Sequence, residues 1–119
     1  MNHSKSILQK KSFELAMMAV SYSKVLHHTR NFDLSSQVLR SGTSVMANIL
    51  ESKYAESKKD YLHKMTIALK EANEIRGWIT LCGAHPSVPD PLNEFKDVSE
   101  ECLAMLISTT RTLKRNLNS

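Results

Sequence analysis

Apolar residues recur every three or four positions along almost the whole chain, which is the spacing that places side chains on one face of an α-helix. The pattern divides into four segments, at about residues 6–28, 33–55, 58–83 and 91–117. Helix breakers are rare, since the chain has three glycines and three prolines and the prolines all lie within residues 86–91. Four helices of similar length joined by short connections predict a single-domain, all-α, antiparallel up-down four-helix bundle.

Residues that favour helix ends mark where three of these helices should begin. Asp33 or Ser35 can cap the second helix, and Ser57 can cap the third. Pro91 suits the first turn of the fourth helix, where a missing backbone N–H has no partner to lose.

The first two helices carry more apolar surface than one bundle needs. Beside its main seam, each has a second apolar strip, formed by Phe13, Ala16, Met17 and Val20 in the first and by Leu39, Met46 and Leu50 in the second. A helix in a monomeric bundle buries one stripe, so the surplus predicts an interface between copies of this chain.

A ridge of polar residues runs along the second helix, where Ser and Asn are mediocre helix formers. If the second and third helices are neighbours, Arg40 can reach a carboxylate of the third helix. We therefore predict a buried polar network of Gln37, Arg40, Ser44, Asn48, Glu51, Glu71 and Glu74. Its favoured role is to fix the register of the helices, and the alternative is a groove that binds a partner.

The charges are unevenly distributed although their sum is only +4. Folding the chain up and down gathers nine of its sixteen basic residues at one end, while the opposite end collects Asp33, Asp90, Glu94, Asp97, Glu100 and Glu101. Helix dipoles do not explain lysines at the starts of the first and third helices, where positive charge is unfavourable. The basic end consists of Lys5, Lys10, Lys11, Lys53, Lys58, Lys59, Arg111, Lys114 and Arg115.

We interpret this basic end as a surface for nucleic acid, with RNA favoured, because clustered cations attract a polyanion. The predicted contacts are Lys5, Lys10, Lys11, Lys58, Lys59, Arg111, Lys114 and Arg115. Few aromatic residues lie nearby, so binding should depend on the phosphate backbone and discriminate weakly between sequences. The alternative is a protein-binding scaffold that uses the polar ridge or an outer apolar strip and binds no nucleic acid.

Catalytic and metal-binding patterns are weak, so we expect no enzyme activity, metal or cofactor. No nucleophile, base and orienting acid occur in a recognisable order. Di-iron bundles use Glu-x-x-His pairs, whereas this chain has only an Asp60-x-x-His63 pair. Eight residues separate Arg76 from His85, too many for helical ribonucleases of the HEPN type. Three histidines expected at one end could bind zinc, but solvent exposure is the favoured interpretation for His27, His28 and His85.

The remaining features favour a soluble, cytoplasmic protein. The longest apolar run, residues 15–20, is far shorter than the ~20 residues that span a membrane. No apolar segment of a signal peptide follows the N-terminal lysines. Cys82 and Cys102 lie within apolar helical patterns and match no metal or redox spacing, so we expect reduced cysteines in the core.

Several motifs together carry a family resemblance over nearly the whole chain. They are Phe13-Glu-Leu, Gln37-x-Leu-Arg40-Ser41-Gly-Thr-Ser44-Val, Ala47-Asn48-Ile49-x-Glu51, Ser57-Lys-x-Asp60-Tyr, Ile67-Ala68-x-Lys-Glu71-Ala-x-Glu74 and Trp78. The chain resembles the four-helix bundle proteins first noticed as reading frames inside intervening sequences of large-subunit ribosomal RNA genes.

This resemblance implies a left-handed up-down bundle that assembles into a ring, with a pentamer favoured. A distantly similar group, the accessory proteins of diversity-generating retroelements, forms pentameric barrels that bind RNA and a reverse transcriptase. One departure is the pair Arg76-Gly77 before Trp78, where an apolar or aromatic pair is expected. That pair puts the packing of the third helix in question there.

Overall fold

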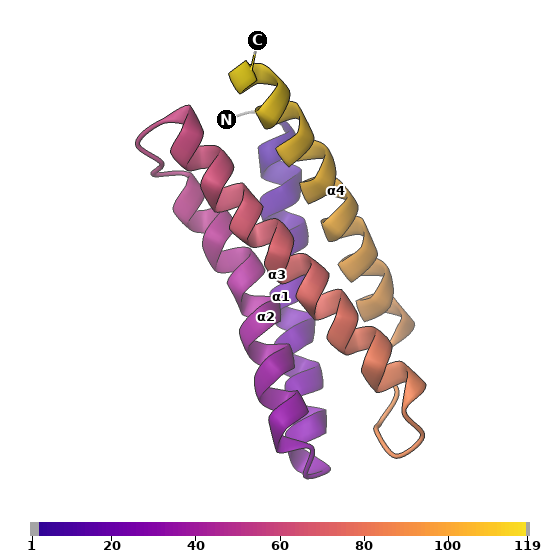
Figure 1. Cartoon of the computed structure of the whole chain (residues 1–119). Coiled ribbons are helices and arrows are strands. Elements are labelled where there is room, and N and C mark those ends of the chain that lie inside the picture. Colours follow the sequence, from indigo (N-terminus) through magenta and orange to yellow (C-terminus); the bar gives the residue numbers. More distant parts are fainter. Residues whose placement is uncertain (1–2, 119) are drawn as a thin grey trace.

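The computed structural model describes the fold of residues 3–118 and the side chains of residues 7–118, and it confirms an all-α four-helix bundle (Figure 1). The described residues form no strand. The bundle is a rod of 50 × 21 × 21 Å. Its helices are α1 (His3–His28), α2 (Phe32–Ser52), α3 (Lys58–Ala84) and α4 (Asn93–Asn118).

Each helix packs on two neighbours, so the four helices enclose one core. Helices α1 and α3 lie diagonally opposite, and each contacts both α2 and α4. The two ends of the chain and the α2–α3 connection lie at one end of the rod, while the other two connections lie at the opposite end (Figure 1). None of the described helices is long and apolar enough to cross a membrane.

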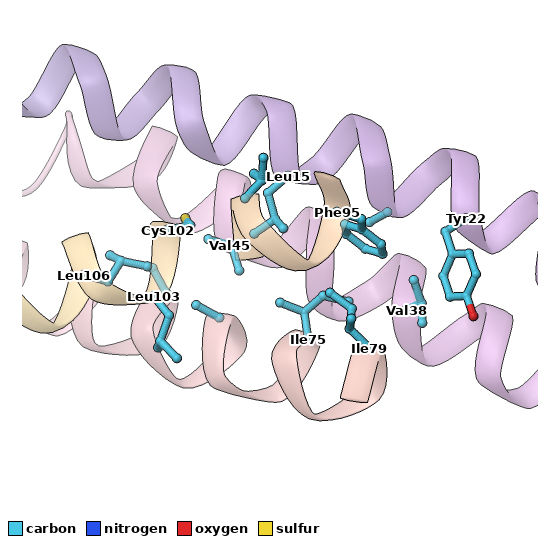
Figure 2. Packing of buried hydrophobic residues seen from close by; sticks show 14 of the residues in the cluster. Leu15, Tyr22, Val38, Val45, Ile75, Ile79, Phe95, Cys102, Leu103 and Leu106 are labelled. Carbon is cyan, nitrogen blue, oxygen red and sulfur yellow. The ribbon is translucent and has the colours of Figure 1, made fainter. Parts of the chain in front are cut away.

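The core consists of the apolar seams that the periodicity indicates. Side chains from all four helices meet along the axis, as Leu15, Val45, Ile75 and Leu106 do in Figure 2. All four are buried, and full burial of one such side chain contributes about 1.5–3 kcal/mol. Small core residues such as Ala19 allow neighbouring helices to come close together.

Helices α1 and α2 approach most closely at Gly42. A Cβ atom added there would overlap the Cβ of Ala19, well inside van der Waals contact. Nearby, the hydroxyl of Ser35 donates to the backbone carbonyl of Ser23 at 2.7 Å, so a side chain links the two helices directly. Part of the unusual polar composition of α2 therefore serves close packing against α1.

The turn between α1 and α2 differs from the predicted cap. Arg30 adopts a left-handed conformation with φ 68°, and the N–H of Asn31 donates to the carbonyl of Leu26 at 2.8 Å. This closing pattern usually places glycine where Arg30 stands. Asn31 occupies the N-cap of α2 without a side-chain hydrogen bond, so the expected cap by Asp33 or Ser35 is wrong.

The end of α2 also differs from its predicted position. The helix ends at Ser52 and not near Ala55, because the chain must reverse before Ser57. Tyr54 and Ala55 make turn-like hydrogen bonds to carbonyls three residues back, at 3.0 and 3.2 Å. Ser57 then caps α3 as predicted, accepting a hydrogen bond from the N–H of Asp60.

The start of α4 is shifted in the same way. The helix begins at Asn93, after Pro91, which is buried in the connection and does not form the first helical turn. The preceding segment is held to α1, because the hydroxyl of Tyr22 donates to the carbonyl of Pro89 at 2.5 Å. This contact joins residues far apart in sequence, which helix-end signals do not detect.

The Arg76-Gly77 departure does not disturb the packing of α3. Gly77 is exposed, and a Cβ added there would meet no atom within 4 Å. Trp78 remains packed against the core and donates from its indole nitrogen to Glu74 at 3.3 Å. The cost of Gly77 is therefore confined to helix propensity, about 1 kcal/mol relative to alanine.

Candidate nucleic-acid interface and polar network

Arg40 of α2 is the centre of a polar cluster on the surface between α2 and α3. Its guanidinium donates to Glu71 at 3.1 Å, to Gln37 at 3.3 Å, and also to Glu74. Glu74 accepts a further hydrogen bond from Trp78. These five side chains of the two helices satisfy one another, as a device that fixes helix register would require.

The rest of the predicted network is not connected to this cluster. Asn48 donates to the backbone carbonyl of Ser44 at 2.8 Å, one turn earlier on the same helix. Glu51 accepts from Lys64 of α3 at 3.2 Å. The structure thus divides the ridge into three separate local groups.

The predicted burial of the polar network is wrong. None of its seven residues is buried, and the Arg40 side chain is 50% exposed. The ridge lies at the outer edge of the α2–α3 contact, because Val38, Val45 and Ile49 occupy the core-facing side of α2. Ser41, which follows Arg40 in α2, does become buried, and its hydroxyl donates to the carbonyl of Gln37.

This exposure changes the expected effect of Arg40→Ala. A buried arginine would leave carboxylates unpaired and would cost about 3–5 kcal/mol. An ion pair half-exposed to water is expected to contribute less than about 1 kcal/mol. Urea denaturation of the variant should therefore show a loss below that value, close to the loss for Lys64→Ala at the other α2–α3 ion pair. A loss of about 3 kcal/mol would contradict the surface interpretation.

Seven cations at one end of the bundle have no acidic partner. They come from all four helix ends that meet there, and no carboxylate of the described residues lies within 4 Å of any of them. All seven residues are exposed. They are Lys10, Lys53, Lys58, Lys59, Arg111, Lys114 and Arg115.

Two predicted contacts do not join this group. Lys11 faces α4, where its ammonium lies 2.7 Å from Glu101 and 3.4 Å from Glu14. The hydrogen bond that Lys11 donates to Glu101 raises the pKa of Lys11, since the carboxylate favours the charged amine. The charge of Lys11 is thus already neutralised. The packing of α1 on α4 places it beside Glu101, which the sequence pattern assigns to the opposite end of the bundle. The side chain of Lys5 lies outside the described residues.

The first turn of α3 shows how its lysines remain unpaired. Asp60 supplies the negative charge that a helix N-terminus favours, and its carboxylate accepts from the N–H of Glu56 at 3.1 Å. The hydroxyl of Ser57 accepts from the N–H of Asp60 at 3.0 Å, so the two side chains satisfy two backbone N–H groups at the start of α3. Lys58 and Lys59 take no part in this arrangement and extend into solvent.

A pocket opens within the same end and was not predicted. It has a volume of about 550 Å³ and lies between the ends of all four helices. A signal for it in the sequence was the continuation of the apolar pattern of α4 to Leu113 and Leu117, which both line the pocket. Its lining includes Gln9, Ile49, Lys53, Lys58, Tyr61 and Leu113.

The residues weighed for metal or catalytic chemistry are dispersed or buried. His27 packs its ring against Phe32 at 4.9 Å, and His85 contacts the hydroxyl of Ser87 at 2.9 Å. Over the described part of the chain, no three His, Cys, Asp or Glu side chains are placed to hold a metal ion. Cys82 and Cys102 are free and buried, and burial raises the pKa of Cys102 to about 12. That thiol is protonated at neutral pH and is a poor nucleophile.

Comparison with known proteins gives a consistent family and fold. Residues 4–108 match the family described as 23S rRNA-intervening sequence protein. The chain is also similar to a protein of unknown function from the S23 ribosomal protein family of Bacteroides thetaiotaomicron, whose crystal structure is known. The two chains are 34% identical with a TM-score of 0.80, over 91% of this chain and 98% of that one. No curated protein matches the chain.

Proposed function

The chain belongs to the 23S rRNA-intervening sequence protein family, and from the charges of its own bundle end we propose that it binds RNA there. The observation that carries the proposal is the group of seven exposed, unpaired cations at one end of the rod. Lysine and arginine side chains that neutralise RNA phosphates would release the counterions condensed on the RNA, and this release would drive association. The proposed role is non-enzymatic, and this family is not a known enzyme family.

The α2–α3 connection adds an aromatic side chain to this surface. Tyr54 is 86% exposed and lies between Lys53 and the lysine pair at the start of α3. An exposed ring beside cations is the arrangement on which a base of a single strand can stack. One such ring does not read a sequence, so we expect similar affinities for unrelated single-stranded RNAs.

The test is a fluorescence-anisotropy titration of labelled single-stranded RNA at several salt concentrations. The logarithm of the affinity should fall linearly with the logarithm of the salt concentration, and each phosphate neutralised should add about 0.7 to the steepness of the slope. Absence of RNA binding at low salt would reject the proposed function.

The proposed location is the cytoplasm, where cysteines are kept reduced and RNA is present.

We also propose that copies of the chain associate through the outer faces of α1 and α2. Phe13 and Met17 of α1 are 57% and 58% exposed, and Leu39 and Leu50 of α2 are exposed on the neighbouring helix. Such apolar surface on two adjacent helices is what a repeated interface would cover. A ring, for which five copies are favoured, would present its basic ends several times over.

Light scattering tests this association. At micromolar concentration, the mass should be several times the 13.5 kDa of one chain. A charge placed on the exposed strip, as in Met17→Glu, should lower that mass without unfolding the bundle, whereas Lys24→Glu on the same helix should leave it unchanged. A monomeric wild type would reject the association.

The second candidate function is a protein-binding scaffold. The observation in its favour is the half-exposed Arg40 cluster, which presents charged and amide groups on the surface of α2 and α3. The two candidates differ in salt-sensitive RNA affinity, which the scaffold lacks. A protein that forms the oligomer but binds no RNA would support the scaffold.

A further inference from the structure

The pocket at the basic end has an apolar floor. Ile49 of α2 and Met65 of α3 line it and are buried, and Leu113 of α4 lines it and is half-buried. Tyr61 lies beside them and is half-buried, and burial raises the pKa of its hydroxyl. The floor therefore offers flat and aliphatic surfaces that suit an apolar or aromatic group.

The mouth of the pocket is polar and positively charged. Lys53 and Lys58 stand on it from opposite sides of the α2–α3 connection, and both are exposed without a carboxylate of the described residues within 4 Å. The amide side chains of Gln9 on α1 and Asn116 on α4 also line the pocket. An occupant should accordingly combine an aromatic body, hydrogen-bonding edges and a negative charge.

A second groove of similar size lacks this combination. It has a volume of about 480 Å³ and lies between α1 and the start of α4. Its apolar lining resembles that of the first pocket, but the charged residues around it are Glu14, Asp90 and Glu94. That groove would repel a polyanion, whereas the pocket between the helix ends attracts one.

We propose that the pocket at the basic end receives one unpaired nucleobase of a bound RNA, with the adjoining phosphates on Lys53 and Lys58. The base would lie against Tyr61 and the apolar floor, and its edge would face the amides of Gln9 and Asn116, which can donate and accept hydrogen bonds. The pocket volume lies within the range of small-molecule sites. This inference rests on the proposed RNA binding and deepens it, because it makes an unstacked base part of what is recognised.

The first arm of the test is photocrosslinking of wild-type protein. A short single-stranded RNA carrying thiouracil bases is bound at low salt, irradiated, and the attachment site is found by mass spectrometry. The base should attach to the peptide that contains Tyr61 and Met65. Attachment confined to Tyr54 or to other surface residues would overturn the inference.

The second arm compares this RNA with an abasic strand of the same length and charge. Loss of the bases should weaken binding to the wild type by about 5–150-fold. The variant Leu113→Phe fills the pocket, so the ratio of its affinities for the two strands should be close to one. Its affinity for the abasic strand should equal that of the wild type, and this equality also shows that the variant is folded. In the control Val25→Phe, a matched aliphatic-to-phenylalanine change in the lining of the second groove, the preference for bases should remain.

The outcomes separate the two proposals. Equal wild-type binding of both strands overturns the pocket inference and leaves RNA binding through phosphates intact. Failure of wild type to bind either strand at low salt overturns both. If Leu113→Phe does not fold, the crosslink position in wild type still decides.

Discussion

Gly42→Ala is expected to lower the free energy of unfolding by about 1–3 kcal/mol, because the added methyl group has no room between α1 and α2. The new Cβ would overlap the Cβ of Ala19. That atom is bonded directly to the backbone, so no side-chain rotation can move it away. The two helices would have to separate, and the hydrogen bond from Ser35 to the Ser23 carbonyl would lengthen with them. Urea denaturation measures the change.

The matched control is the same substitution at Gly77. That glycine lies inside α3, where an added Cβ would meet no atom within 4 Å, so alanine should stabilise the protein by up to about 1 kcal/mol. The two identical changes should thus have opposite signs. Equal effects would contradict the close approach of α1 and α2.

The second large effect is expected for RNA affinity when three basic-end lysines are replaced. In the triple variant Lys10→Gln, Lys58→Gln and Lys59→Gln, three exposed and unpaired charges are removed. Each lost phosphate contact reduces the salt slope by about 0.7, so the slope should fall by roughly two units. At about 0.1 M salt, this corresponds to a loss of affinity of roughly a hundredfold. Titration by anisotropy measures both quantities.

A charge-matched variant controls for net charge. Lys24, Arg30 and Lys70 are also exposed and lack a carboxylate partner within the described residues, but they lie away from the basic end. Their replacement by glutamine should change RNA affinity only slightly. Equal losses in the two triple variants would show that net charge alone controls binding. The basic-end variant should not unfold, because Lys58 and Lys59 oppose the dipole of α3.

Periodicity was sufficient to predict the bundle because core burial and helical spacing act together in every segment. The buried seam of α3, for instance, includes Met65, Ala72 and Ile79 at the expected intervals. Ser57 was also predictable, since its cap involves only residues of its own first turn. Helix boundaries set by tertiary contacts were not predictable in this way. Pro91 and the end of α2 are examples.

The charged residues were harder to assign for a related reason. A helical pattern indicates which face of a helix is polar, but not how far that face lies from the core. Arg40 therefore looked buried, whereas it lies at the outer edge of its helix pair. Lys11 looked free because its partner Glu101 lies 90 residues later and becomes a neighbour only through the packing of α1 on α4.

Hydrogen–deuterium exchange with and without single-stranded RNA tests most directly whether RNA is bound at the basic end. Backbone amides in helix connections and last turns exchange readily, so coverage by RNA is measurable there. At low salt, RNA should protect residues 52–62 and 110–118, while the connections at 29–32 and 85–92 should exchange as in the free protein. Protection at those opposite connections, or no protection anywhere, would contradict the account.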